Sequence, residues 1–143
     1  MAIRRLRFTI DSGRVLSNST SQFVLGSHTV TSTPAGNESL TGFITNFSVK
    51  STIYCNDSAG AHGARIWYKL AGGKYNPSTG LEISTGTNGV SAANGIIYGS
   101  AFSAAITYDV SGANWRCLIT PPDSTTYLWI ATHEVEYVSM SVL

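Results

Sequence analysis

A strict two-residue alternation over residues 42–55 constrains the fold more than any other feature. Odd-numbered positions carry the residues Phe43, Thr45, Phe47, Val49, Ser51, Ile53 and Cys55, and even-numbered positions carry Ile44, Asn46, Ser48, Lys50, Thr52 and Tyr54. Successive side chains of a β-strand point to opposite faces, whereas a helix would scatter both sets around its circumference. The run therefore predicts a long strand that buries its odd-numbered face.

The same period of two recurs along most of the chain, and no segment shows a convincing helical period. Further strands are expected at Leu6–Ile10, Gln22–Leu25, Ser27–Thr31, Ala64–Ala71, Leu81–Ser84, Ile96–Tyr98, Phe102–Val110, Trp115–Ile119, Tyr127–Thr132 and Val135–Val142. Turns or loops are expected at Asn56–Gly63, Gly72-Gly73, Thr85–Gly95 and Ser111–Asn114. This pattern predicts one all-β domain over residues 1–143, an antiparallel β-sandwich of about 8–10 strands. A jelly roll is the favoured arrangement, and an immunoglobulin-like sandwich is the alternative.

Charge and hydropathy exclude several classes of function. The formal net charge is only +1, so the chain lacks the basic footprint of a protein whose main partner is nucleic acid. No apolar run approaches the roughly 20 residues of a membrane span, and no secretory signal is apparent, so no membrane partner is expected.

Charged residues are scarce, at 12% of the chain, and two stretches hold none when His28 is taken as neutral: residues 15–37 and 83–108. Charge depletion is typical of a surface that another chain covers, although Ser/Thr/Asn-rich loops can also stay hydrated without charge. Under the first interpretation the loop region 85–102, inside the second stretch, supplies contacts between subunits, and the candidate residues are Val90, Ile96, Ile97, Tyr98 and Phe102.

Residues 1–10 form a basic N-terminal strand or arm. Ile3, Arg4, Arg5 and Arg7 are the candidate residues for docking onto an acidic partner surface. The alternative is an ordinary outward strand face, because the alternation places Arg5 and Arg7 opposite Leu6 and Phe8.

No motif for catalysis, for a cofactor or for a metal is found, and a non-enzymatic protein is expected. Cys55 and Cys117 both fall on inward strand positions, either as free thiols or as a bridge between sheets, and two cysteines alone cannot form a metal site. Glu134 and Glu136 share one strand face, as the carboxylates of a glycosidase or a calcium site can, but a solvated strand face is the commoner reason.

Trp67 and Tyr75 are candidate residues for binding a ligand. The alternation of Ala64–Ala71 places Trp67 between Arg65 and Lys69, on the side opposite Ile66, Tyr68 and Leu70. An outward tryptophan can stack on a sugar ring, and aromatic residues at protein interfaces give the same pattern. A carbohydrate- or receptor-binding module is therefore the alternative to a purely structural protein.

Two resemblances to known families accompany these patterns. Ile53–Cys55, Trp67–Lys69 and Ser111–Cys117 resemble the Cys…Trp…Cys framework of immunoglobulin-like domains, but the first cysteine comes late and Trp115 stands where that family has its corner tyrosine. In length, in Ser/Thr/Gly/Asn content, in low charge and in its final alternating strand, the chain is similar to small β-sandwich virion proteins of tailed bacteriophages.

The bacteriophage resemblance implies a role but assigns no residue. The family includes capsid decoration (cement) proteins, head-fibre domains and tail receptor-binding domains. It implies a virion protein that is assembled in the host cytoplasm and contacts a major capsid or tail protein. It also implies a homo-oligomer such as a trimer, with no cofactor, and with a glycan as a further ligand if the protein is an adhesin.

Overall fold

The computed structural model describes residues 3–30, 43–57, 63–76, 79–83, 91–98 and 104–141, and within these ranges the chain is built from β-strands without a helix. The strands within these ranges are β1 (Ile3–Asp11), β2 (Val15–Ser17), β3 (Phe23–Thr29), β4 (Phe43–Asp57), β5 (Ala64–Asn76), β6 (Gly80–Ile83), β7 (Ser91–Tyr98), β8 (Ala105–Ser111), β9 (Asn114–Thr120) and β10 (Tyr127–Ser141).

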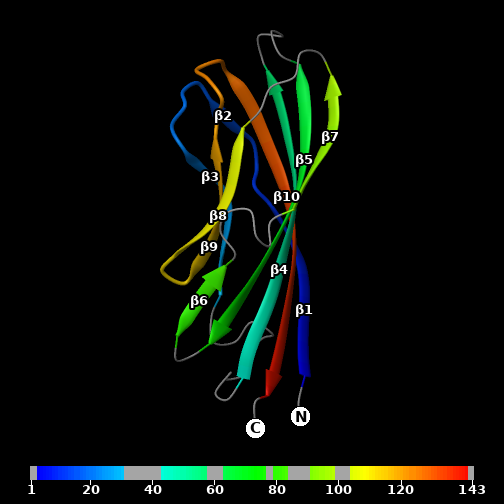
Figure 1. The fold of residues 1–143 in the computed structure, drawn as a ribbon, viewed down its shortest axis with the longest axis vertical. Helices are drawn as coiled ribbons and strands as arrows, with labels where there is room; N and C mark the ends of the chain where they lie inside the picture. Colours follow the sequence, from blue (N-terminus) through cyan, green and yellow to red (C-terminus); the bar gives the residue numbers. More distant parts are fainter. Residues whose placement is uncertain are drawn as a thin grey trace.

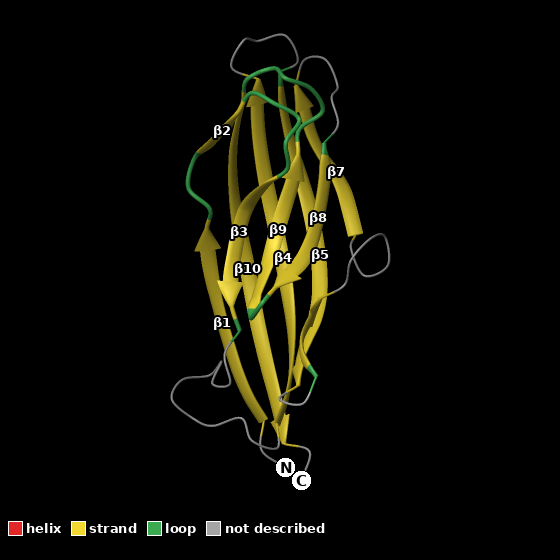
Figure 2. Cartoon of the chain, turned by 90° about the vertical axis from the view of Figure 1, so that its left-hand side faces the viewer, coloured by secondary structure: helices red, strands yellow, loops and turns green. Residues whose placement is uncertain are grey.

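Two antiparallel sheets pack against each other in an elongated sandwich (Figures 1 and 2). The large sheet has the order β1-β10-β4-β5-β6, with β2 continuing the β1 edge of β10 and β7 lying along the same edge of β5 as β6. The small sheet has the order β3-β9-β8. The predicted all-β antiparallel sandwich is confirmed, and the choice between a jelly roll and an immunoglobulin-like arrangement stays a prediction.

Strands β4 and β10 form the centre of the large sheet. They pair along their whole lengths, from Phe43 opposite Ser141 to Asp57 opposite Tyr127. On β4 the side chains of Phe47, Val49 and Ile53 are buried, as the alternation predicts.

The core lies between the inner faces of the two sheets and is rich in aromatic residues. The largest fully buried side chains include Trp115, Trp129, Tyr108, Tyr127 and Tyr137. Burying such side chains is the main stabilisation of the fold, and each buried polar tip needs a partner. Trp129 donates to the Ser17 hydroxyl at 2.8 Å, and Tyr127 donates to the Asp123 carboxylate at 3.0 Å.

Three predicted boundaries differ from the structure because glycine and histidine have tertiary roles. The two strands predicted at Gln22–Leu25 and Ser27–Thr31 are a single strand, β3, with a bulge between Val24 and Ser27 where Gly26 has φ +129°; Thr31 lies outside the described residues. The predicted break between Tyr127–Thr132 and Val135–Val142 is absent, since His133 continues β10 as a buried residue.

The Gly72-Gly73 pair is the third difference, because β5 runs through the predicted turn to Asn76. A Cβ atom at Gly73 would lie 2.3 Å from Cζ of Phe47. Glycine is therefore required here by the close approach of the Phe47 ring and does not mark a chain reversal.

Two predicted loops are shorter than expected. Strand β4 continues through Asn56 to Asp57, and β7 begins at Ser91, inside the predicted loop Thr85–Gly95. The Ser111–Asn114 turn is confirmed, with Gly112 at φ +60°.

Candidate functional site: the outer face of the large sheet

The outer face of the large sheet, turned away from the small sheet, carries a large group of exposed apolar side chains. It is formed by the even-numbered residues of β4, β5 and β10 and the odd-numbered residues of β1, together with Leu16 of β2 and Glu82 of β6. In sandwich proteins such a face is ordinarily polar along its strands. The departure from this rule makes the outer face the candidate functional site.

The apolar half of the outer face lies towards the Asp57 end of β4. Ile130 stands opposite Tyr54 in the β10–β4 register, and Tyr54 stands opposite Ile66 of β5. Leu16, Tyr68 and Leu70 complete this surface. The exposed fractions of its large apolar side chains are Leu16 57%, Tyr54 42%, Tyr68 40%, Leu70 44% and Ile130 47%. Asp11, opposite Thr132, marks its edge on β1. This contiguous apolar surface is the feature that the sequence patterns missed, because its members occupy strand positions assigned to solvent or to the core.

The charged half of the outer face lies beside it, towards the Phe43 end of β4. It is defined by Arg5, Arg7, Lys50, Lys74, Glu82, Glu134 and Glu136. Glu136 forms an ion pair with Arg7 at 2.5 Å and a longer one with Arg5 at 3.8 Å. Lys74 forms an ion pair with Glu82 at 3.2 Å. Lys50 and Glu134 stand directly opposite each other but form no ion pair with any described residue. Both signs of charge are thus present, and two charges are uncommitted.

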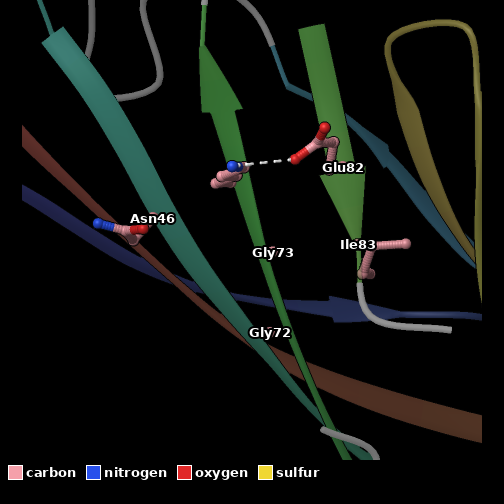
Figure 3. A pocket seen from close by; sticks show the side chains of 6 residues that line it. Asn46, Gly72, Gly73, Glu82 and Ile83 are labelled. Atoms are coloured by element: carbon pink, nitrogen blue, oxygen red, sulfur yellow. Dashed lines mark ion pairs between the residues drawn. The ribbon is translucent and has the colours of Figure 1, made fainter. Parts of the chain in front are cut away.

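Shallow depressions cross the charged half. One of about 520 Å³ is lined by residues that include Arg7, Lys50, Leu70 and Glu134. A second, of about 360 Å³, lies between β4 and β6, and Figure 3 shows the Lys74–Glu82 ion pair beside it and Asn46 on the neighbouring strand. Because Gly72 has no side chain, the β5 part of this surface is low, and another surface can approach the sheet closely.

Trp67 is not on this outer face, and its predicted role as an exposed stacking platform is wrong. Its side chain is 3% exposed and stacks on Trp129 with ring centroids 5.9 Å apart, while the Arg65 guanidinium lies 5.2 Å from the Trp67 ring centroid. The inward and outward phases of Ala64–Ala71 are reversed relative to the prediction, so Tyr68 and Leu70 are exposed instead. Tyr75 is half-buried against the core.

The basic N-terminal segment forms strand β1 of the sheet, paired to β10 from Ile3 opposite Met140 to Asp11 opposite Thr132. Arg5 and Arg7 are exposed on the charged half, with their guanidinium groups directed to Glu136. The side chains of Ile3 and Arg4 lie outside the described residues. Docking through these residues stays a prediction.

The predicted subunit-contact residues fall mostly outside the described part of the chain. Val90 and Phe102 lie outside the described residues, as do the side chains of Ile96, Ile97 and Tyr98. The backbone of β7 lies along the β5 edge of the apolar half, with Tyr98 opposite Ala64 in register.

A serine–histidine pair is present, but its position in the core makes it structural. Ser51 donates a hydrogen bond to Nδ1 of His133 at 2.6 Å, and Tyr108 donates to the Ser51 hydroxyl at 2.6 Å. Ser51 and His133 are both fully buried, so no substrate reaches them in this conformation. Burial also lowers the pKa of His133 from its ordinary value. The two residues stand opposite each other within the large sheet, and the hydrogen bond from Tyr108 links them to β8 of the small sheet.

The two cysteines are free thiols buried in the core. Burial raises the pKa of the Cys117 thiol to about 12, and burial and the nearby Asp57 carboxylate hold the pKa of Cys55 well above its ordinary value. The thiolate is the reactive form of cysteine, so neither residue is suited to nucleophilic or redox chemistry in the native state.

Within the described ranges, no group of three or more histidine, cysteine or acidic side chains is arranged to hold a metal ion. Among the same residues, no helix has the length and hydropathy to cross a bilayer.

Comparison with known proteins gives one structural likeness. No family model matches the chain. No curated protein matches its sequence. Among solved structures, the chain is similar to part of the tailspike protein of Acinetobacter baumannii phage AM24, with a TM-score of 0.42 and 7% sequence identity. The match covers 96% of this chain and 26% of the tailspike, so the chain spans about a quarter of that protein's length.

Proposed function

We propose that this protein is a non-enzymatic structural protein of a virus particle that acts through protein–protein contacts, as a capsid-decorating or shell-forming subunit. The apolar half of the outer face is the observation that carries the proposal. Monomeric proteins seldom leave large aromatic and aliphatic side chains gathered on one surface, and such surfaces mark sites of association. Tyr54, Tyr68 and Ile130 form a group of this kind across three adjacent strands.

The use of polar residues in the core also supports a structural role. Side chains of the kinds used in catalysis are held in hydrogen bonds inside the core. Ser51 bonds to His133, and Tyr108 bonds to Ser51. The high Ser/Thr/Gly/Asn content and the low charge, which resemble those of small β-sandwich virion proteins, also support this function. Many copies on a particle make modest contacts effective, because each further contact is made within one assembly.

Two measurements test this function. Sedimentation velocity at increasing protein concentration is expected to show self-association that Ile130→Asp abolishes, while the matched change Ser111→Asp, on the exposed β8–β9 turn of the other sheet, leaves it intact. Immunogold electron microscopy of particles purified from the source organism is expected to label them. A chain that stays monomeric at high concentration and labels no particle would contradict the proposal.

A second candidate function is receptor or glycan binding by a virion protein. Tyr54 and Tyr68 favour it, because two exposed rings stand on adjacent strands next to the depressions of the charged half. Amphipathic rings beside polar groups suit a sugar surface. Glycan binding that Tyr68→Ala removes, with the fold intact by circular dichroism, would support this function, and the Trp67 platform is no longer part of it.

A further inference from the structure

We propose that the partner of the outer face is the same face of a second copy of this chain, related by a two-fold axis that runs along the strands between β4 and β10. This inference rests on the proposed function and names its partner. Strands β10 and β4 are neighbours in the middle of the large sheet (Figure 2), so such an axis places β10 of one copy over β4 of the other. An isologous contact of this kind must be complementary to itself.

The size of the apolar half argues that more than this half is covered. If a whole large side chain offers about 200 Å², the exposed fractions of Leu16, Tyr54, Tyr68, Leu70 and Ile130 correspond to roughly 450 Å². A stable interface buries about 800 Å² on each partner. The apolar half supplies about half of that area, so the charged half must be buried with it.

The two uncommitted charges fit this symmetry. Lys50 and Glu134 stand opposite each other across the β4–β10 pair, one on each side of the proposed axis, and form no ion pair with each other. The two-fold rotation brings Lys50 of one copy over Glu134 of the other, and it does so twice. The same rotation brings Ile130 over Tyr54, so apolar side chains meet apolar ones.

The remaining charges are compatible with this packing. At the end of the charged half, Arg5 of one copy lies towards Lys74 of the other, but each already has a carboxylate partner, Glu136 and Glu82. Aligned sheets cross at about −30° because of their twist, which separates the corners of the two faces. A two-fold axis perpendicular to the strands would bring the apolar halves together but leave both charged halves uncovered. The axis along the strands is therefore the one that both buries enough area and brings opposite charges together.

Charge reversal tests the arrangement. In Lys50→Glu each copy presents two acidic residues beside the axis, and in Glu134→Lys each presents two basic ones. Each single variant is expected to raise the dimer Kd about tenfold or more, because two opposite-charge contacts become like-charge contacts. An equimolar mixture of the two variants is expected to form a heterodimer of wild-type affinity, since both cross-copy contacts are again between opposite charges.

The mixture separates the proposed contact from effects within one chain. Inside each variant the neighbouring positions 50 and 134 still carry like charges, so recovery on mixing arises only between copies. Ser111→Glu is the matched control and should dimerise like the unmodified chain, and circular dichroism and urea unfolding establish that every variant is folded.

The outcomes are distinct. A wild-type dimer, weakened single variants and recovery on mixing support the two-fold contact. Single variants that associate normally, a mixture that fails to recover, or a wild-type trimer would overturn it and leave the virion function standing. A wild-type monomer would overturn it as well, and immunogold labelling of particles then decides the proposed function independently.

Discussion

His133 on β10 donates a hydrogen bond from Nε2 to the carbonyl oxygen of Leu25 on β3, with the two atoms 2.6 Å apart. The bond crosses from the large sheet to the small one at a position that solvent does not reach. Since a carbonyl only accepts, Nε2 carries the proton and Nδ1 accepts from Ser51. One neutral tautomer therefore holds the sheets together, and its environment determines the pH dependence of the fold.

Stability is expected to fall as the pH drops below about 6.5, the ordinary pKa of histidine. Burial lowers the pKa of His133, and also that of His28, in the folded chain. Below pH 6.5 the unfolded chain therefore binds protons that the folded chain does not. The stabilisation by a neutral His133 is complete above that pH and is lost towards its folded pKa, at up to about 1.4 kcal/mol per pH unit for each such histidine.

Urea unfolding at pH 7.5, 6 and 5 measures this dependence. His133→Asn should unfold more readily at pH 7.5 but lose less stability between pH 7.5 and 5 than the unmodified chain. The same loss in both proteins would show that His133 does not take up the proton on unfolding.

Gly26→Ala is expected to be strongly destabilising, by about 3 kcal/mol or more, because a buried hydrogen bond is displaced as well as the backbone strained. Gly26 has φ +129°, and a Cβ there would lie 2.2 Å from Nε2 of His133. Gly13 has φ +73° with no atom within 4 Å of its Cβ position, so Gly13→Ala is the matched control and should cost only about 1 kcal/mol. Equal losses in the two variants, measured by urea unfolding, would contradict the role of His133.

The two thiols are expected to resist modification in the folded protein. At pH 8 a thiol reagent such as Ellman's reagent should react with neither Cys55 nor Cys117 during the time in which the urea-unfolded chain reacts at both. The physical reason is their burial, which keeps both thiols protonated. Rapid reaction of the native protein at either cysteine would show that the core opens readily.

Trp67→Ala is expected to lower the free energy of unfolding by about 3–5 kcal/mol, as for other large buried aromatic side chains. The Trp67 ring stacks on Trp129, so the intrinsic fluorescence should also change. Tyr68→Ala on the same strand removes a side chain that is 40% exposed and should cost less than about 1 kcal/mol. A Trp67→Ala variant as stable as the unmodified chain would contradict the buried position.

Alternation predicted the strands well where one face was clearly more apolar. Along β4 the odd positions hold most of the large apolar residues, so both the strand and its buried side followed from the sequence. Along β5 both sides are apolar, with Ile66, Tyr68 and Leu70 against Trp67 and Ala71. The period then predicts the strand, but only the packing of Trp67 on Trp129 decides which face is buried.

Long-range contacts explain the remaining differences. His133 interrupts the apolar pattern of β10, and its burial is permitted by Leu25 and Ser51, which are distant in sequence. The apolar half of the outer face could not be predicted from the sequence for the same reason. Tyr54, Ile130 and Tyr68 become neighbours only through the register of β10, β4 and β5.

The full-length pairing of β4 with β10 has a mechanical consequence. All fifteen residues of each strand are matched, so a pull on these two strands in opposite directions along the long axis loads the whole ladder in shear. Rupture then requires many cross-strand bonds to break together, whereas peeling from one end would break them singly. This geometry gives the domain its greatest resistance to tension in the direction of its length.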